Sequence, residues 1–543
     1  MLPTPRFPLL LFVAGVLFSG TSLLLAQNRF PGPIPEGDFA VRLLKFATLP
    51  NSFGDVGARV QQTSTDPSGR LFANDQRGPL YHISGDGTVS LYLDLRDPAY
   101  SSYLNLRETN EGGFTGWVFH PDFFNSGTEG YGRLYTIFSS NNTSVRAPDF
   151  DPGGGTNHHT VLLEWQTDDP NAIPFSPGTP AQPAGTGLPF RELMRFKQPF
   201  GNHNSGIIAF NPYAEAGDPE RTRLYIAMGD AGSGNDPQEN AQNPSNPYGA
   251  ILRIDPIPDN TSDRYDIVLD NVLAQDAMTA DTLDEIYAYG LRNPQWFSWD
   301  ASTDALYSAD IGQNAVEELN LIVNGGHYGW DLREGSFDFE IMSGETTTDL
   351  IDPVAEYDHS GDIDSSAAPT GGRAITCGEV IRGTGINALD GMLPLADFPT
   401  GNLLLLDVDN ALLQGGNSEL RAVPIVDEDG ASVSFLELIA EEVEARELDD
   451  GLSRVDARYS VGTPGEIYVS NKRDGVIRRL VIVPEMALAH DVSGDSVTID
   501  YIGRLQWRAL LEAGDWEDVE PQPASPWTFA PIEPQGFFRT ESN

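Results

Sequence analysis

The sequence predicts an all-β protein: a six-bladed β-propeller followed by a small C-terminal β-rich module. Three observations support this prediction. A strand-like phrase recurs six times, long helical periodicity is nearly absent, and 55 glycines and 40 prolines provide many turns between short strands. We assign residues 1–26 to a signal peptide, 27–483 to the propeller and 484–543 to the terminal module.

The recurring phrase is a turn rich in Gly, Pro or Asp, then a branched apolar residue, then a strand-like run. Its copies are DPSGRLFAND, GYGRLYTIFS, ERTRLYIAMGD, STDALYSADIG, PTGNLLLLDV and TPGEIYVSN, with the branched residues Leu71, Leu134, Leu224, Leu306, Leu403 and Ile467. A four-stranded blade takes about 40–50 residues, so each longer interval holds one blade with loop insertions. The alternative is a pair of unrelated β-sandwiches. The best helical candidate is the short acidic stretch SFLELIAEEVEARELDD.

The first 26 residues resemble a secretory signal peptide. Arg6 precedes a long apolar run that ends in a small residue, with cleavage expected near Ala26 and Gln27. An uncleaved membrane anchor is the alternative. No later segment is apolar enough to span a bilayer, so we expect a secreted or periplasmic protein with no integral membrane segment after cleavage.

Charge and cysteine content exclude several classes of function. The formal net charge is −46, which makes a nucleic-acid partner very improbable because phosphate binding needs a basic surface. Cys377 is the single cysteine, which excludes intrachain disulfides, thiolate metal clusters and a CxxCH haem site. The last 60 residues combine strand-like runs with Trp and Phe, and either bind a carbohydrate or a surface or cap the propeller edge.

Six phrases along the chain resemble the soluble pyrroloquinoline-quinone-dependent glucose/sorbosone dehydrogenase family. They are EGGFTGWVFHPDF, NHNSGIIAFNP, RLYIAMGDAG, EIYAYGLRNPQWFSWD, DIGQNAVEELNLIVNGGHYGW and TCGEVIRG, in the family's order and within residues 40–483. The resemblance implies a six-bladed propeller that oxidises an aldose or related sugar alcohol group. It also implies pyrroloquinoline quinone and calcium as cofactors, a sugar substrate and a separate electron acceptor.

Oxidation of a sugar hydroxyl by hydride transfer needs a base for the hydroxyl proton and a cation near the quinone oxygen. His203 in NHNSG matches the family's general base, Asp230 in MGDAG the carboxylate that orients it, and Arg292 in GLRNPQ the arginine that polarises the quinone. Each has a structural alternative. The histidine could satisfy a loop hydrogen bond, the aspartate could form a turn, and the arginine could bridge two blades.

The same resemblance assigns cofactor and metal contacts. Asn293, Gln295 and Arg382 match quinone contacts, and the main-chain carbonyls of Gly312 and Gln313 match the calcium ligands. Glu317 and Glu318 either support this turn or form a solvated acidic pair.

Two residues are predicted to contact the sugar: Glu111 in EGGFTG and Asn235 in GDAGSGND. The segment Gly325–Trp330 is expected to pack blades together rather than to touch substrate.

The chain departs from the family in one respect. A basic pair should follow the LLLL strand, but here the stretch is LLLLDVDNALLQGG, without Lys or Arg. Either another loop supplies the charge, with Lys472 and Arg473 as candidates, or the quinone site is lost. The second function class is therefore a non-catalytic propeller that binds a sugar or a protein.

Overall fold

The computed structural model describes residues 34–483, apart from short segments at 110, 179–187, 261–262, 276–281, 341–346, 348, 360–373, 384–387, 412–417, 450 and 463–465. Beyond residue 483 it describes only the backbone of six strands. The predicted signal peptide lies outside the described residues, so its cleavage and the export of the chain stay predictions.

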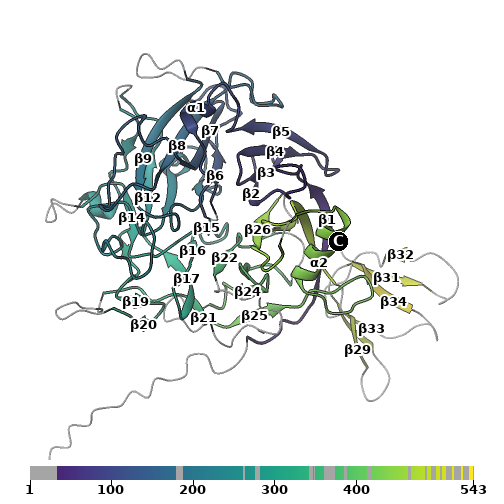
Figure 1. Cartoon of the computed structure of the whole chain (residues 1–543). Helices are drawn as coiled ribbons and strands as arrows, with labels where there is room; N and C mark the ends of the chain where they lie inside the picture. The colour runs from purple at the N-terminus through teal and green to yellow at the C-terminus, as the bar shows by residue number, and fades with distance from the viewer. Residues whose placement is uncertain are drawn as a thin grey trace, which may run out of the picture.

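Six sheets stand around a central axis, which confirms the predicted propeller (Figure 1). We number the blades 1 to 6 in chain order. From the axis outwards, blade 1 contains β2 (Val60–Thr65), β3 (Leu71–Asp75), β4 (Pro79–Ile83) and β5 (Val89–Asp94), and blade 2 contains β6 (Phe114–Phe119), β7 (Arg133–Ser140), β8 (His158–Gln166) and β9 (Phe190–Gln198). Blade 3 contains β10 (Ile208–Phe210), β11 (Leu224–Met228), β12 (Ala250–Asp255) and β14 (Ile286–Tyr289), extended by β13 (Asp266–Ile267) and β18 (Gly326–His327).

The remaining blades follow the same plan. Blade 4 contains β15 (Trp296–Trp299), β16 (Leu306–Asp310), β17 (Val316–Ile322) and β21 (Ala355–Asp358), and blade 5 contains β22 (Ile375–Cys377), β23 (Met392–Asp397), β24 (Leu403–Asp407) and β25 (Leu420–Val423). Blade 6 contains β26 (Arg458–Val461), β27 (Ile467–Ser470), β28 (Val476–Ile482) and, outermost, β1 (Val41–Thr48). A hairpin of β19 (Arg333–Glu334) and β20 (Phe337–Asp338) follows β18.

Strand β1 closes the ring by joining the two ends of the propeller. It pairs antiparallel with β28, from Val41 opposite Ile482 to Thr48 opposite Val476. Both sides of blade 6 are thereby fixed by residues more than 400 positions apart in the sequence. Closure in this way gives blade 6 its fourth and outermost strand and ties the start of the propeller to its end.

The recurring phrase marks one defined place in five of the six blades. Its branched residue lies at the start of the second strand in blades 1 to 4 and in blade 6. In blade 5 it falls one strand later, because Leu403 begins the third strand, β24. The turn before β24 is closed by Asp397, which accepts a hydrogen bond from the hydroxyl of Thr400 (2.6 Å). The phrase therefore reports a hairpin turn followed by a strand, and either hairpin of a blade can provide it.

The expected helix is present as α2 (Phe435–Ala445). Ser434 and Glu437 form a capping box at its start, and Phe435, Ile439 and Val443 are its buried residues, four positions apart. These side chains join the core of blades 5 and 6. The other helical segments are single turns: α1 (Ser101–Leu104) and 3₁₀ turns at Pro219–Thr222 and Val272–Gln275. None of the described helices is long and apolar enough to cross a membrane.

The C-terminal strands form two small antiparallel sheets, as the predicted β-rich module requires. One contains β29 (Met486–His490), β30 (Val497–Tyr501) and β33 (Trp527–Phe529), and the other β31 (Arg504–Arg508), β32 (Glu517–Asp518) and β34 (Phe537–Glu541). The roles proposed for this module stay predictions.

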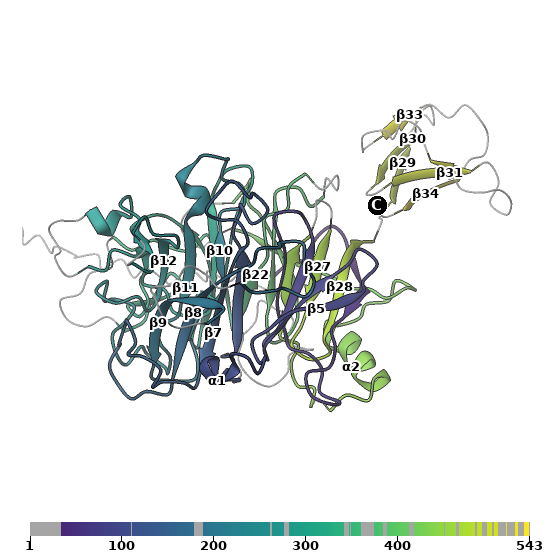
Figure 2. The same cartoon turned by 90° about the horizontal axis from the view of Figure 1, so that it is seen from above.

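The innermost strands β2, β6, β10, β15, β22 and β26 run from one face of the ring to the other, and Figure 2 shows the ring from its edge. We call the face at which they begin the N-terminal face and the face at which they end the C-terminal face. Because six chain segments start at the same face, residues just before these strands meet although they are far apart in sequence.

Closure by β1 leads to a stability prediction. Leu43 is 8% exposed and packs in the core of blades 5 and 6, whereas its neighbour Leu44 is 45% exposed. Leu43→Ala should lower the free energy of unfolding by about 2–5 kcal/mol, the usual cost of truncating a buried leucine. Leu44→Ala is the matched control and should stay within about 0.5 kcal/mol of the parent. Urea unfolding followed by tryptophan fluorescence checks both, and equal effects would contradict the closure role of β1.

Candidate active site

A cavity of about 250 Å³ opens at the N-terminal face of the axis. Its walls come from segments that precede the inner strands and from neighbouring turns. The lining residues are Arg59, Glu111, His203, Asn293, Gln295, Ile311, Ala374, Phe398, Arg454, Asp456, Lys472 and Arg473. Four residues that the sequence analysis selected, Glu111, His203, Asn293 and Gln295, therefore share this cavity.

His203 stands in an unusual backbone conformation just before β10. Its φ is 51°, in the left-handed region that few residues other than glycine adopt, and it is only 4% exposed. The backbone N–H of His203 donates to Oε2 of Glu111 (2.8 Å). Gly229 packs so closely that a Cβ there would lie 2.4 Å from the carbonyl oxygen of His203. Such strain persists only where the surroundings fix the residue, and it is common at active sites.

The ring of His203 is held by Asp230. Nδ1 of His203 lies 2.7 Å from Oδ1 of Asp230, which also accepts the backbone N–H of Gly232 (2.8 Å). The other carboxylate oxygen accepts the indole N–H of Trp330 (3.0 Å). Burial alone would raise the pKa of Asp230, but His203 and Arg292 outweigh it and hold this pKa below its ordinary value. The ionised carboxylate places the imidazole proton on Nδ1, which leaves Nε2 of His203 as an acceptor.

Arg292 belongs to the same group of side chains through Trp330. Its guanidinium carbon lies 5.2 Å from the centre of the Trp330 ring. Its Nη1 donates to the carbonyl oxygens of Ile311 (2.9 Å) and Gly312 (2.6 Å). The structure thus brings His203, Asp230 and Arg292 together, although Arg292 lies behind the cavity lining rather than in it.

Asp310 fixes the backbone that carries Arg292 and Asn293. Its two carboxylate oxygens accept the backbone N–H groups of Arg292 (2.8 Å) and Asn293 (2.6 Å). Burial raises the pKa of Asp310 to about 6. The sequence analysis quoted this aspartate within SADIG but gave it no role.

The turn at Gly312 and Gln313 is organised by two buried carboxylates. Oε1 of Glu334 accepts the backbone N–H groups of Gln313 (2.6 Å), Asn314 (2.7 Å) and Ala315 (2.9 Å), and Oε2 of Glu317 accepts that of Gly312 (3.2 Å). Glu317 therefore supports the turn, which was one of the two alternatives for it. Glu318 is buried and bonds Asn320 (2.9 Å), so it is not a solvated residue.

Two sequence predictions need correction. Arg382 follows β22 at the C-terminal face, where its guanidinium binds Asp300 (2.7 Å) and Asp409 (2.8 Å), so it does not reach the cavity of His203. The calcium site expected at Gly312 and Gln313 stays a prediction, and the carbonyl oxygen of Gly312 accepts from Nη1 of Arg292 (2.6 Å).

Asn235 is the second correction. Its side-chain oxygen accepts from Nε2 of Gln313 (2.6 Å) and its amide donates to Glu340. It ties two loops together and is absent from the described lining of the cavity. The sugar contact predicted for this residue therefore has no support in its position.

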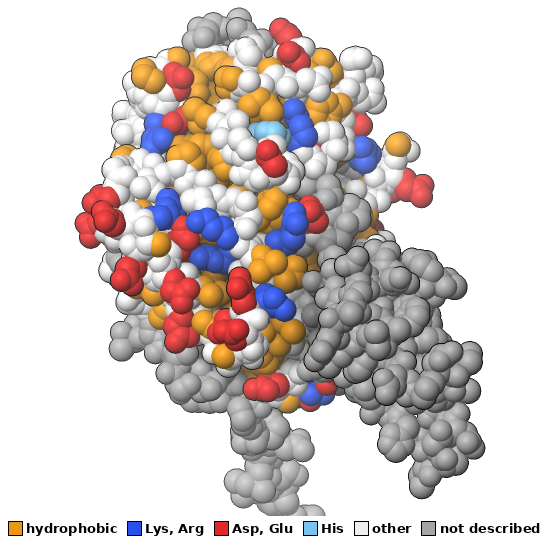
Figure 3. All heavy atoms as spheres, turned by 90° about the vertical axis from the view of Figure 1, so that its right-hand side faces the viewer, with side chains coloured by type: hydrophobic (Ala, Val, Ile, Leu, Met, Phe, Trp, Pro, Cys, Tyr) orange, Lys and Arg blue, Asp and Glu red, His pale blue; other side chains and the backbone are white. Residues whose placement is uncertain are grey.

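Basic side chains reach the cavity from loops that the family comparison did not single out. Arg59, Arg454, Lys472 and Arg473 line it, against the two acids Glu111 and Asp456. This surplus is unusual in a chain with a net charge of −46. Figure 3 shows basic side chains beside acidic ones on an outer face of the protein. Lys45 has such an acidic partner in Glu442 (2.7 Å).

Lys472 is the least compensated of these cations. It is 4% exposed, and no hydrogen bond or ion pair joins its ammonium group to any described residue. Nζ of Lys472 lies 5.5 Å from the centre of the Phe398 ring. Burial and neighbouring Arg458 hold the pKa of Lys472 well below its ordinary value. Of the two alternatives for the missing basic pair, the positions favour supply from another loop.

Several contributors were missed in the sequence. Trp330 was expected only to pack blades, yet it also binds Asp230 and covers Arg292. Glu334 and Arg454 were not considered. Arg454 lies just before β26, and the position before an inner strand, which His203 also occupies, was the available signal.

The fold and the site define a six-bladed propeller that holds a carboxylate-bound histidine at the basic mouth of its axis. A model of the glucose/sorbosone dehydrogenase family matches residues 61–381. The chain belongs to this family.

Known proteins similar to this chain agree with that membership. HIPL1 protein of Arabidopsis thaliana is 31% identical over 348 residues, which cover 56% of this chain and 47% of that protein. Quinoprotein glucose dehydrogenase B of Acinetobacter calcoaceticus is 25% identical over 230 residues, 40% of each chain. The chain spans about half the length or less of these curated relatives. The soluble aldose sugar dehydrogenase of Escherichia coli, solved in its apo form, has the same fold, with a TM-score of 0.52 at 18% identity over 82% of this chain and 99% of that one.

Asp236 gives a prediction for the pH dependence of stability. It ends the loop that carries Asp230, is completely buried, and only its Oδ2 accepts a hydrogen bond from a described residue, the N–H of Ala241 (2.7 Å). Burial and Asp230 raise its pKa from 3.8 to about 7. Between these values the folded state binds the extra proton, so stability is lost as the pH rises towards 7.

Asp236→Asn should remove this loss while keeping the acceptor for Ala241. The drop in unfolding free energy between pH 5 and pH 8 should shrink by up to about 3 kcal/mol, because this interval covers about two pKa units at about 1.4 kcal/mol each. Asp168→Asn, at an exposed position, is the control and should leave the drop unchanged. Urea midpoints at both pH values measure it, and parallel curves for parent and Asp236→Asn would refute the assignment.

Proposed function

We propose that this protein is an exported quinone-dependent oxidoreductase that oxidises an aldose or related sugar alcohol group. Family membership supports the coarser part, a sugar dehydrogenase-like function. One observation carries the finer part. A strained, buried histidine bound through Nδ1 to a carboxylate lines a cavity with a surplus of basic side chains.

The cavity fits pyrroloquinoline quinone, which carries three carboxylates. Lys472 has no hydrogen-bond or ion-pair partner among the described residues, and Arg59, Arg454 and Arg473 line the same cavity. A bound carboxylate would compensate the buried ammonium of Lys472, which the surrounding cations now disfavour. Asn293 and Gln295 offer polar contacts on the same wall. When bound, the quinone supplies the acceptor for the hydride that leaves the sugar carbon.

The chain supplies the proton acceptor. Nε2 of His203 takes the hydroxyl proton of the sugar, because Nδ1 already carries the proton shared with Asp230. The imidazolium that forms is stabilised by this buried carboxylate, which is itself kept ionised by Gly232 and Trp330. Glu111 holds the backbone of His203 and lines the cavity, so its proposed place beside the sugar also serves to position the base.

Arg292 acts from behind the lining in this proposal. Its charge lies against Trp330 and the carbonyls of Ile311 and Gly312, where it favours negative charge developing in the cavity in front of Asn293. We assign no step to calcium, because Arg292 occupies the carbonyl of Gly312. A calcium ion at Gly312 and Gln313 stays a prediction from the sequence.

Electrons must then pass to a separate acceptor, because no haem attachment motif exists in the sequence. Export to the periplasm or the medium rests on the N-terminal signal peptide and belongs to the proposal. The second candidate is a non-catalytic propeller that binds sugar or protein. The absent basic pair after β24 and the distant position of Arg382 favour it.

Lys472 provides the test of cofactor binding. Lys472→Met keeps the length of the side chain but removes its charge, so the affinity for pyrroloquinoline quinone should fall at least tenfold. The measurement is quenching of tryptophan fluorescence during a quinone titration, with and without added calcium. Lys45→Met removes the same charge from an exposed position and should leave the affinity unchanged. If the parent binds no quinone at micromolar concentration under either condition, the enzyme proposal fails and the binding propeller is favoured.

His203 provides the test of catalysis. His203→Gln should lower turnover of a sugar panel by about 10²–10⁴-fold, the usual contribution of a general base. Dye reduction by the quinone-loaded protein measures the rate, and quinone titration of the same sample measures the loaded fraction. His327→Gln is the matched control, because this partly buried histidine stacks on Tyr289 away from the cavity. A His203→Gln rate within threefold of the parent would assign His203 a purely structural role.

A further inference from the structure

A second and larger cavity, of about 470 Å³, lies at the C-terminal face of the same axis. Its lining comes from the ends of the inner strands and the turns after them, whereas the cavity of His203 is lined by residues that precede these strands. All six blades contribute to it. Of the residues that the sequence assigned to the quinone and sugar sites, only Arg382 is among the described residues that line this second cavity.

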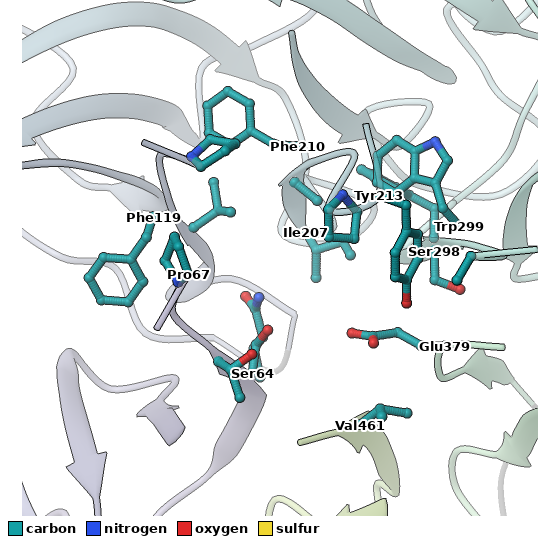
Figure 4. Close-up of a pocket in the computed structure, with 18 of the residues that line it drawn as sticks. Ser64, Pro67, Phe119, Ile207, Phe210, Tyr213, Ser298, Trp299, Glu379 and Val461 are labelled. Carbon is teal, nitrogen blue, oxygen red and sulfur yellow. The ribbon is translucent and has the colours of Figure 1, made fainter. Parts of the chain in front are cut away.

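Aromatic and aliphatic side chains form most of its wall. Phe119, Phe210 and Trp299 are nearly fully buried, and Tyr213 is 40% exposed at the rim. Figure 4 shows Tyr213, Ile207 and Val461 around an open space, whereas the rings of Phe119, Phe210 and Trp299 lie at its margin and pack against other rings of the core. Its size and composition are those of pockets that enclose small ligands.

One carboxylate points into this apolar space. Glu379 follows β22, is partly buried, and in Figure 4 extends into the cavity near the hydroxyl group of Tyr213. No hydrogen bond or ion pair joins it to any other residue that the structure describes. Burial raises the pKa of Glu379 to about 7, so its charge is only poorly stabilised by the protein itself.

The other charges of the lining are already compensated. Asp66 binds Arg70 (2.6 Å), Arg221 binds Asp122 (3.5 Å), and Arg382 binds Asp300 and Asp409. Glu379 is therefore the one charged group among the described lining residues without a counter-ion. A cation that enters would meet a desolvated carboxylate and the partly exposed ring of Tyr213, and both features bind organic ammonium groups.

We propose that this cavity is a binding site for a small organic cation, an ammonium group attached to an apolar or aromatic body. The ammonium would pair with Glu379, and the apolar body would pack against Tyr213, Ile207 and Val461. A neutral ligand of the same shape would leave the carboxylate buried without a partner, and an anion would be repelled. The formal charge of −46 also concentrates cations around the protein. The site does not depend on the quinone or on His203.

Phenyltrimethylammonium and its neutral carbon analogue tert-butylbenzene test this proposal on the full chain without quinone. Their shapes agree and their charges differ, and the fluorescence of Trp296 and Trp299, which both line the cavity, reports occupation. The cation should bind at least tenfold more tightly than the neutral compound at pH 8. Equal affinities would mean a merely apolar hole and would overturn the proposal, as would no binding of the cation at millimolar concentration.

Variants of Glu379 locate the site. Glu379→Gln should weaken binding of phenyltrimethylammonium at least tenfold while leaving tert-butylbenzene unaffected. Glu215→Gln removes the same charge from an exposed position two residues after Tyr213 and should change neither affinity. Equal losses in the two variants would show that only the general negative field matters, against the proposal. Melting temperatures of both variants check that each is folded.

The pH dependence gives an independent readout, because phenyltrimethylammonium does not titrate. Binding to the parent should weaken as the pH falls through about 7, where Glu379 takes up a proton. The groups that face Glu379 do not mimic this behaviour. Burial and Glu379 itself raise the pKa of Tyr213, and the other charged lining residues are the ion-paired Asp66, Arg221 and Arg382. A parent affinity that is flat from pH 6 to pH 8, or the same slope in Glu379→Gln, would contradict the assignment.

Discussion

The hydrogen bond between Nδ1 of His203 and Asp230 is the interaction on which the axial site depends. A carboxylate this deeply buried stays ionised only where several donors converge, and here they come from His203, Gly232 and the indole of Trp330. These donors belong to segments up to 127 positions apart, from His203 to Trp330. They meet because these segments flank β10, β11 and β18, which all belong to the sheet of blade 3, so the chemistry of the site is tied to the strand order of this blade.

The sequence was sufficient for the fold because a propeller repeats its local signals. A turn followed by a branched apolar residue identified one hairpin in each of six blades, and the short acidic stretch SFLELIAEEVEARELDD contained α2. The signal could not tell which hairpin of a blade it marked. In blade 5 the phrase marked the short turn between β23 and β24, whereas residues 378–391 connect β22 to β23.

A site residue could be placed from the sequence where its motif shows whether the residue precedes or follows an inner strand. His203 and Asn293 precede inner strands and meet in one cavity, whereas Arg382 follows β22 and lies at the other face. The phrase VIRG identifies Arg382 but does not show on which side of an inner strand it lies. Glu334 accepts backbone N–H groups and Arg454 lines the cavity, and neither role leaves a pattern in a single sequence.

The two ends of the axis differ in charge because different segments supply them. Segments before inner strands bring Arg59 and Arg454 to the N-terminal face, and the turn between β27 and β28 brings Lys472 and Arg473 there. The strand ends bring aromatic residues and one uncompensated carboxylate to the C-terminal face. Gln295 lines one cavity and its neighbour Trp296 the other, so only the middle layer of the inner strands separates them. Within that layer Arg458 donates to Gln295 (3.1 Å), and its guanidinium carbon lies 6.0 Å from the centre of the Trp296 ring. Arg458 is thus a buried cation between the two ends of the axis, and it favours anions at the N-terminal end. Its contact with Trp296 shields its charge from the C-terminal end. The acidic outer surface and the basic axial mouth are therefore compatible in one chain, because the basic groups are confined to a small volume from which most of the acidic side chains are excluded.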